Sequence, residues 1–187
     1  MKFLTGVDPR WVTERLLEMG EQQVKQAGDS RAAYNLAGRL YLSPTGFLLL
    51  SVPSALVQGV FSAMHEPGIE LPPSPGGKLE AHITVFRPEE VAAIGGAAKI
   101  TERGKMFNYR LGGLYSLEPA GWPEMERVWC LSVSSQPLQV LRKSYGLSAL
   151  PDEGRKRFHI SVAVRRRRVL GDNPVSKVDA GAAGDLH

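Results

Sequence analysis

The chain has 187 residues, of which 43% are hydrophobic and 22% charged, and its formal net charge is +4. This composition is ordinary for a globular protein and excludes both a disordered tail and a membrane protein, and a chain of this length buries enough surface to fold without disulfides. The single cysteine, Cys130, excludes an internal disulfide and a cysteine-based zinc site.

The sequence shows no targeting or membrane segment. Its longest apolar run, residues 47–50, is far shorter than the stretch of about 20 residues that spans a bilayer. No hydrophobic signal-peptide core follows the first residues. We therefore expect a cytoplasmic protein with a reduced cysteine and no contact with a membrane.

The positive charge is concentrated in one short segment. Seven basic residues and no acidic one lie between residues 155 and 168, whereas the rest of the chain has 16 basic and 19 acidic residues. A solvated basic surface is one explanation of this segment. A phosphate-bearing ligand is the other, because a concentrated basic patch attracts anions.

The first half of the chain predicts a helix, an ambiguous segment and a strand–helix–strand unit. Asp8 and Pro9 are typical of a helix start, so we expect a helix over about residues 9–27. Residues 31–42 do not decide between helix and strand. Turn signals and periodicity then predict a strand at 46–52, a helix opened by Pro53, a loop at 67–77 and a strand at 79–86.

The second half predicts a similar series of elements. Residues 105–117 are expected to form a strand with a bulge or turn at Gly112 and Gly113. It is followed by a predicted strand at 127–133, a helix at 136–145, a loop at 146–154 and a strand at 157–164. The tail after residue 171 is expected to be mobile. Each half therefore contains a strand, a helix, a loop and a terminal strand.

The two terminal strands carry the same short motif. They read Ala81-His82-Ile83-Thr84-Val85 and Phe158-His159-Ile160-Ser161-Val162. Because side chains at positions i and i+2 point to the same face of a strand, each strand presents one imidazole and one hydroxyl together. The two isoleucines then point to the opposite, apolar layer.

Two imidazoles and two hydroxyls suit acid–base chemistry on a phosphodiester. Imidazole titrates at about pH 6.5, so near neutral pH one histidine can be the neutral base while the other is the protonated acid. Hydroxyl groups donate hydrogen bonds to the non-bridging phosphate oxygens and stabilise the charge that grows in the transition state. This chemistry needs no metal and no other cofactor, and we expect neither.

The paired motifs resemble those of the 2H phosphoesterases, a family named for two His-x-[Thr/Ser] motifs about this far apart. The resemblance covers Gly46 to about Val164. It implies an α+β fold with two similar lobes, each an antiparallel sheet with outer helices, around a central cleft. It also implies that His82 and His159 face one another as acid and base, with Thr84 and Ser161 holding the phosphate.

The resemblance also suggests a division of the chain. Residues 1–45 are expected to be a helical N-terminal extension, and residues 46–170 the bilobal domain. Its lobes would cover about 46–100 and 101–170, and residues 171–187 would form the tail.

Members of this family act on several nucleotide substrates. These are RNA 2′,3′-cyclic phosphates, 2′-5′ linkages, ADP-ribose cyclic phosphate, RNA 3′ ends and cyclic oligonucleotide signals of antiviral immunity, the last including substrates of phage anti-CBASS enzymes. We therefore expect a metal-independent phosphodiesterase whose partner is RNA, an oligonucleotide or a cyclic nucleotide. The alternative is a non-catalytic RNA or cyclic-nucleotide binding module on the same fold.

Other residues are weaker candidates for substrate binding. Arg87 follows the first motif, and Arg155, Lys156 and Arg157 precede the second, where they could attract phosphates. The four arginines at 165–168 are more typical of a general basic surface. Tyr115 is the preferred stacking partner for a base. Tyr41, Phe47 and Trp122 stay open for that role, whereas Trp129 and Cys130 are expected in the core and His65 is not expected to bind a metal.

Overall fold

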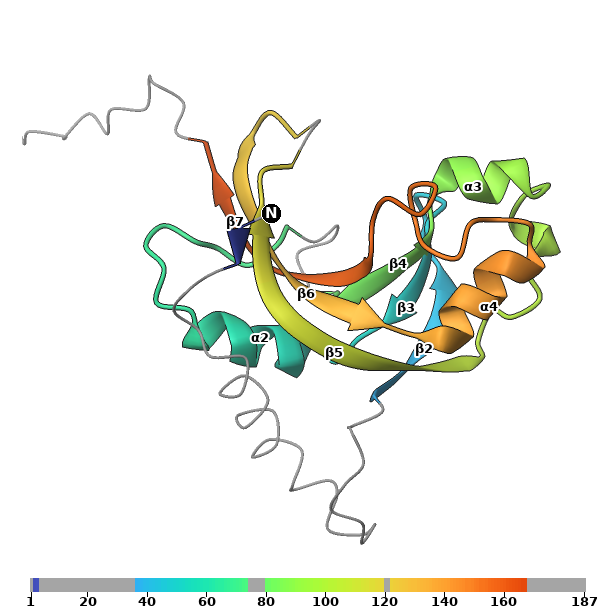
Figure 1. Ribbon diagram of the computed structural model, residues 1–187, viewed down its shortest axis with the longest axis horizontal. Coiled ribbons are helices and arrows are strands. Elements are labelled where there is room, and N and C mark those ends of the chain that lie inside the picture. Colours follow the sequence, from blue (N-terminus) through green and yellow to red (C-terminus); the bar gives the residue numbers. More distant parts are fainter. Residues whose placement is uncertain (1, 4–35, 74–79, 120–121, 168–187) are drawn as a thin grey trace, which may run out of the picture.

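An antiparallel sheet is the main element of the structure (Figure 1). The computed structural model describes residues 2–3, 36–73, 80–119 and 122–167. Its strands are β1 (Lys2–Phe3), β2 (Leu36–Leu42), β3 (Leu48–Ser51), β4 (His82–Phe86), β5 (Met106–Leu117), β6 (Met125–Ser134) and β7 (Phe158–Arg166). The strand order is β4-β3-β2-β5-β6-β7, and β1 pairs with β5. The helices are α2 (Ser54–Ala63), α3 (Pro88–Ala93), α4 (Gln136–Ser144) and the 3-10 helix η1 (Ala97–Lys99).

The two halves of the chain repeat one arrangement. The series β2-β3-α2-β4 and the series β5-β6-α4-β7 have the same strand pairings, because the third strand pairs with the second and the second with the first in each. The pair β2–β5 joins the halves. The last strand of each half therefore lies at one end of the strand order.

The α+β prediction is confirmed, but the predicted division into two sheets is not. Strand β5 has 12 residues. Its beginning, Met106 to Tyr109, pairs with β2, whereas the rest, from Arg110 onwards, pairs with β6. Because one long strand pairs with both halves, the hydrogen bonding runs continuously from β4 to β7.

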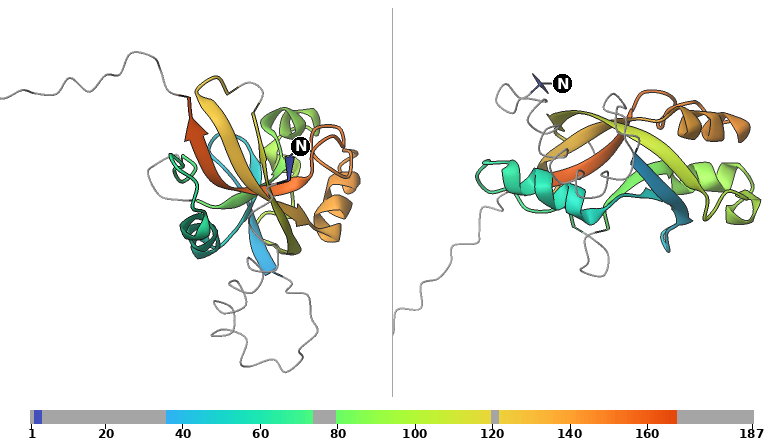
Figure 2. Two further views of the ribbon diagram at one scale, coloured as in Figure 1. Left: turned by 60° about the vertical axis from the view of Figure 1, so that its left-hand side comes forward. Right: turned by 90° about the horizontal axis from the view of Figure 1, so that it is seen from below.

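The two ends of the strand order come together in space. Strand β4 contacts β7, although the two do not neighbour each other in the strand order. Helix α2 contacts β7, and helix α4 contacts β4 and β5. Each helix thus packs on the last strand of the other half, and Figure 2 shows α2 and α4 towards opposite ends of the sheet.

The helices and strands are explained by their burial patterns. Helix α2 begins after Pro53 and buries Leu56, Val57 and Val60 on one face. In α4 the hydroxyl of Ser135 accepts a hydrogen bond from the backbone N–H of Leu138 at 3.2 Å and so caps the helix. Their apolar faces join the main core, which also contains buried side chains of β3, β4, β6 and β7.

Most predicted elements are confirmed, with bounds that differ by a few residues. The predicted strands and helices after residue 45 correspond to β3, α2, β4, β5, β6, α4 and β7. The predicted bulge at Gly112 and Gly113 is confirmed by a register shift between Leu111 and Leu114. Helix α3 was not predicted, because its six residues are too few to give a periodic pattern.

The N-terminal part of the chain contributes a strand to the sheet. The sequence pattern of residues 31–42 does not decide between helix and strand, and the structure shows that this segment contains strand β2. In β2 the buried Gly38 and Leu40 alternate with exposed Ala37 and Arg39, which is the period of a half-buried strand. The predicted helix at 9–27 and the tail after residue 171 lie outside the described residues. The division into domains stays a prediction.

No helix among the described residues is long and apolar enough to cross a membrane.

Candidate active site

The two motif strands show the same alternation of side chains. In β4, Ile83 and Val85 have 0% exposure, whereas His82 is exposed and Thr84 half-buried. In β7, buried Ile160 and Val162 alternate with half-buried His159 and Ser161. Each strand therefore presents one imidazole and one hydroxyl on the face opposite the main core.

The folding of the chain places the two motifs in one region. Strands β4 and β7 contact each other. The charge of the His82 imidazole is felt at His159, where it helps to lower the pKa.

The two histidines are held by the same local hydrogen bond. Nδ1 of His82 lies 2.8 Å from the carbonyl oxygen of Glu80, and Nδ1 of His159 lies 3.0 Å from the carbonyl oxygen of Arg157. A carbonyl oxygen only accepts, so each Nδ1 carries a proton and donates it. In the neutral ring Nε2 is then the atom with a free lone pair, and it can accept a proton or, once protonated, give one.

The environment of His159 favours its neutral form. Burial lowers its pKa, and the charges of Lys156, His82 and Arg87 lower it further, while the hydrogen bond to the Arg157 carbonyl acts in the opposite direction. A neutral imidazole is the form that accepts a proton, so His159 is suited to act as a base near neutral pH.

The neighbouring strands extend the internal repeat beyond the motifs. Ser51 of β3 lies opposite His82, and Ser132 of β6 lies opposite His159. Each serine is approached closely by a glycine of the next strand. A Cβ atom on Gly38 would lie 2.1 Å from the carbonyl oxygen of Ser51, and one on Gly112 would lie 2.2 Å from Oγ of Ser132. A glycine inside a strand is the sequence signal of a close contact with the neighbouring strand. The matching of Gly38 with Gly112 is not apparent from the sequence, because the loops of the two halves differ in length.

The second motif hydroxyl has a buried neighbour. Cys130 lies opposite Ser161, with 3.9 Å between Sγ and Oγ, and Tyr115 lies opposite Cys130 on β5. Burial raises the pKa of Cys130 to about 11, so it remains a thiol near neutral pH. The predicted burial of Cys130 is confirmed, but its contact with Ser161 could not be predicted from its apolar surroundings.

A pocket of about 550 Å³ opens beside His159. This volume lies within the range of small-molecule sites. Its charged lining residues are Arg127, Arg155, Lys156, Arg157 and Glu118, and Tyr115 also lines it. Three predicted substrate-binding residues, Tyr115, Arg155 and Arg157, are therefore brought together with His159. Arg127 was missed because it lies on β6, far from the motif in sequence.

The chain matches one family along most of its length. The description "Swiss Army Knife, 2H phosphoesterase domain" fits residues 46–170. The chain belongs to the 2H phosphoesterases. No curated protein and no solved structure matches it. Membership in this family supports a phosphodiesterase-type hydrolase whose substrates are nucleotide phosphodiesters.

The basic segment of this 2H phosphoesterase is divided between two roles. Arg165 pairs with Glu66 at 3.2 Å and lies over the ring of Trp129, which is buried as predicted, and Arg166 pairs with Glu70 at 2.5 Å. These two arginines therefore hold β7 against the chain that follows α2. Phosphate attraction by the whole segment is thus an incomplete explanation of its charge.

The cations before the second motif are less completely paired. Arg155 and Lys156 contact Asp152 at 3.2 Å and 3.4 Å, and Arg155 also lies 3.4 Å from Glu153. These four side chains lie at the surface or near it. Surface ion pairs of this kind are weak. Arg157 forms no ion pair with a described residue, and its guanidinium lies beside the pocket.

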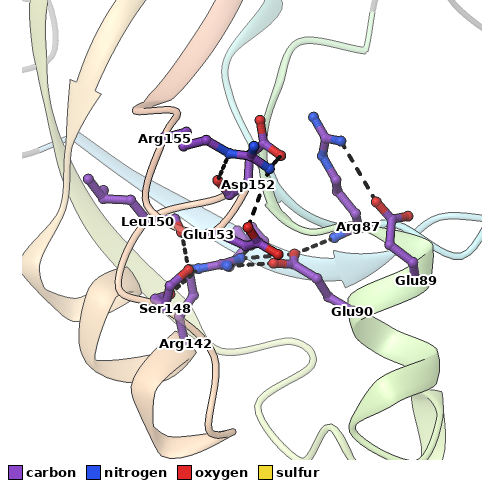
Figure 3. A network of polar contacts seen from close by, with 10 residues as sticks. Arg87, Glu89, Glu90, Arg142, Ser148, Leu150, Asp152, Glu153 and Arg155 are labelled. Atoms are coloured by element: carbon purple, nitrogen blue, oxygen red, sulfur yellow. Dashed lines mark hydrogen bonds and ion pairs between the residues drawn. The ribbon is translucent and has the colours of Figure 1, made fainter.

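Arg87 belongs to a polar network that the sequence did not reveal (Figure 3). Its backbone N–H donates to the Glu90 carboxylate at 2.9 Å, and Glu90 accepts two hydrogen bonds from the buried Arg142. Its side chain lies 3.7 Å from Glu89. Arg87 does not line the pocket, but its charge reaches His159.

The aromatic candidates differ in exposure. Tyr115 is only 8% exposed, so little of its ring is open to a base. Trp122 is 49% exposed and lies between β5 and β6, but it does not line the pocket. Stacking by either residue stays a prediction. Among the described residues, no group of three or more His, Cys, Asp or Glu side chains could hold a metal ion.

Proposed function

We propose that this 2H phosphoesterase cleaves a phosphodiester of a cyclic or linear oligonucleotide by acid–base catalysis with His82 and His159. The observation that carries the proposal is that each of the two imidazoles makes the same kind of hydrogen bond. In both halves Nδ1 is occupied by a backbone carbonyl, which leaves Nε2 for proton transfer. A buried structural histidine has no need for this duplicated geometry on two contacting strands.

In the proposed hydrolysis, His159 is the base and His82 the acid. Nε2 of His159 takes a proton from water while the water oxygen forms a bond to phosphorus. The bond between phosphorus and the leaving ribose oxygen breaks, and Nε2 of protonated His82 gives that oxygen a proton. One water is consumed, and the two histidines exchange protonation states until solvent restores them. Each such proton transfer contributes about 10²- to 10⁴-fold to the rate.

Thr84 and Ser161 hold the phosphate in this proposal. Their hydroxyls donate to the two non-bridging oxygens, where negative charge increases in the transition state. The Ser161 hydroxyl lies 3.9 Å from Sγ of Cys130, and when the thiol donates to the hydroxyl, the Ser161 proton is left for the phosphate. The pocket cations then hold the rest of the substrate.

A substrate panel tests the proposal. The protein is incubated with 2′,3′-cyclic nucleotides, 2′-5′ and 3′-5′ oligonucleotides and cyclic di- and trinucleotides, and the products are identified by mass spectrometry. We expect turnover of at least one class, in the presence of EDTA, and loss of turnover with retained binding in His82→Ala and in His159→Ala. Loss of all activity in EDTA that a divalent ion restores would exclude the metal-independent mechanism. Binding without turnover in the wild type would support a non-catalytic binding module instead.

A further inference from the structure

The two halves of the site have the same geometry but opposite charge. The residue whose carbonyl holds the histidine is Glu80 in the first half and Arg157 in the second. Both side chains are exposed. Neither side chain forms an ion pair with a described residue.

Each half also has a tyrosine at an equivalent position in the strand register. Across the strands of the first half, Tyr41 lies opposite Leu49, which lies opposite Thr84. In the second half, Tyr115 lies opposite Cys130, which lies opposite Ser161. The tyrosines therefore occupy matching places in the row that carries the motif hydroxyl.

The effects on the tyrosines show the difference in charge. Burial raises the pKa of Tyr41, and the Glu80 carboxylate raises it further. Burial also raises the pKa of Tyr115, but there the Arg157 guanidinium acts in the opposite direction. The tyrosine of the first half is thus influenced by a carboxylate and the tyrosine of the second half by a guanidinium.

The positive side is also the side with the pocket. Arg157 lines it together with Arg127, Arg155 and Lys156, whereas Glu118 is its one acidic lining residue among those described. Glu118 lies 3.7 Å from Arg127 and offsets that one charge. Arg155 and Lys156 are offset in turn by Asp152 and Glu153, which lie 3.2–3.4 Å from them. Arg157 is then the lining cation that has no acidic partner among the described residues, so the pocket retains a positive charge next to His159 that can attract a phosphate.

We propose that Arg157 and Glu80 fix the direction of the substrate, with the phosphate next to the scissile one bound against Arg157 in the pocket and the uncharged end on the side of Glu80. This inference rests on the proposed function. It specifies the substrate as a nucleotide or oligonucleotide with a second phosphate on one side of the cleaved phosphodiester. Glu80 contributes by repelling that phosphate from the other side.

The test compares the binding of two compounds that differ by one phosphate. They are adenosine 2′,3′-cyclic phosphate and the same compound with a 5′-phosphate, and their affinities are measured by titration calorimetry. The full chain with His82→Ala is used, so that turnover does not consume the compounds. We expect the 5′-phosphorylated compound to bind about tenfold more tightly, as one charge-assisted contact provides.

Three further variants in this background locate the effect. Arg157→Met should reduce the ratio of affinities to about one, and the fold should be retained because the exposed side chain of Arg157 does not hold His159. Arg166→Met removes the same charge at the far end of β7, from a side chain bound to Glu70, so the ratio should remain. Glu80→Gln should raise the affinity for the 5′-phosphorylated compound at least as much as that for the other compound, because its reversed orientation is no longer repelled, so the ratio should not fall.

Each other outcome counts against a particular statement. Equal affinities in the His82→Ala protein, a ratio that Arg157→Met leaves intact, or no binding of either compound would overturn the directional proposal. A ratio abolished equally by Glu80→Gln would overturn the assignment of the phosphate to the Arg157 side. Turnover that persists in His82→Ala would contradict the acid–base function, and it is detected separately by its products.

Discussion

The Arg142 guanidinium and the Glu90 carboxylate form a buried, two-point ion pair that links the halves of the chain. Nη2 and Nη1 of Arg142, on α4, lie 2.6 Å and 3.1 Å from the two oxygens of Glu90, on α3. The side chain of Arg142 has 0% exposure. It also donates to the carbonyl oxygens of Val85 and Ser148, so the segment after the first motif is tied to the loop before the second.

Removing this guanidinium should destabilise the protein strongly. Arg142→Met leaves a buried carboxylate and two carbonyl groups without their donor, so we expect the free energy of unfolding to fall by about 3–5 kcal/mol. Urea denaturation followed by circular dichroism measures it. In Arg166→Met, which breaks an ion pair between half-exposed side chains, the loss should be about 1 kcal/mol or less. Equal losses in the two variants would show that the buried pair has no special weight.

The lowered pKa of His159 predicts the acid limb of the pH–rate profile. Because the base must be neutral, kcat/KM should fall only below about pH 6.5, the usual range for imidazole. Lys156→Met removes a positive charge that disfavours the protonated ring, so the pKa should rise and the limb should move to higher pH. Lys143→Met, on the exposed face of α4, is the matched control and should leave the limb in place. A limb that Lys156→Met leaves unmoved, or moves to lower pH, contradicts the role of His159 as the base.

The motif hydroxyls should affect kcat more than KM. Their hydrogen bonds strengthen as charge grows on the phosphate, so Thr84→Val and Ser161→Ala should each lower kcat by about 10²-fold. Thr84→Ser and Ser161→Thr keep the donor and should retain most of the activity. Steady-state kinetics on the substrate found in the panel separates the two parameters. A rise in KM with kcat unchanged would indicate that the hydroxyls bind the ground state and the transition state equally.

Gly38 should be intolerant of a side chain, whereas Gly113 should accept one. A Cβ atom at Gly38 would lie 2.1 Å from a backbone oxygen of β3, so Gly38→Ala must displace that strand opposite His82. We expect a loss of about 1–3 kcal/mol in stability and a lower kcat. At Gly113 nothing lies within 4 Å of the added atom, so Gly113→Ala should change stability by less than about 1 kcal/mol. Thermal unfolding of the two variants compares them, and similar melting temperatures would argue against the close approach.

The local structure of the site could be predicted from the sequence. Alternation along the two motif strands was sufficient to place each imidazole with its hydroxyl, because a strand has a fixed period of two. Turn signals and apolar runs located most of the strands and helices after residue 45. The carbonyl groups that hold Nδ1 of each histidine lie two residues before that histidine, but these hydrogen bonds depend on the side-chain rotamer, which the sequence does not specify.

Contacts between distant segments could not be predicted. The pairing of Arg165 with Glu66 and of Arg166 with Glu70 depends on the path of the chain after α2. Burial of Arg142 also has no local signal, because a cation near the end of a helix is usually solvated. The join between β2 and β5 was hidden by the ambiguous pattern of residues 31–42, and it determines whether the strands form one sheet or two.

Both histidines lie on strands at the ends of the strand order, and this has a mechanical consequence. Among the described residues, β4 and β7 do not pair directly with each other, so no backbone hydrogen bond between these two strands sets the separation of the two imidazoles. That separation depends on side-chain packing between β4 and β7 and on the packing of α2 on β7 and of α4 on β4. Changes of core volume beneath these helices should therefore change the spacing of the proposed acid and base. The packing of the core would then limit the size of the group that can react between the two imidazoles.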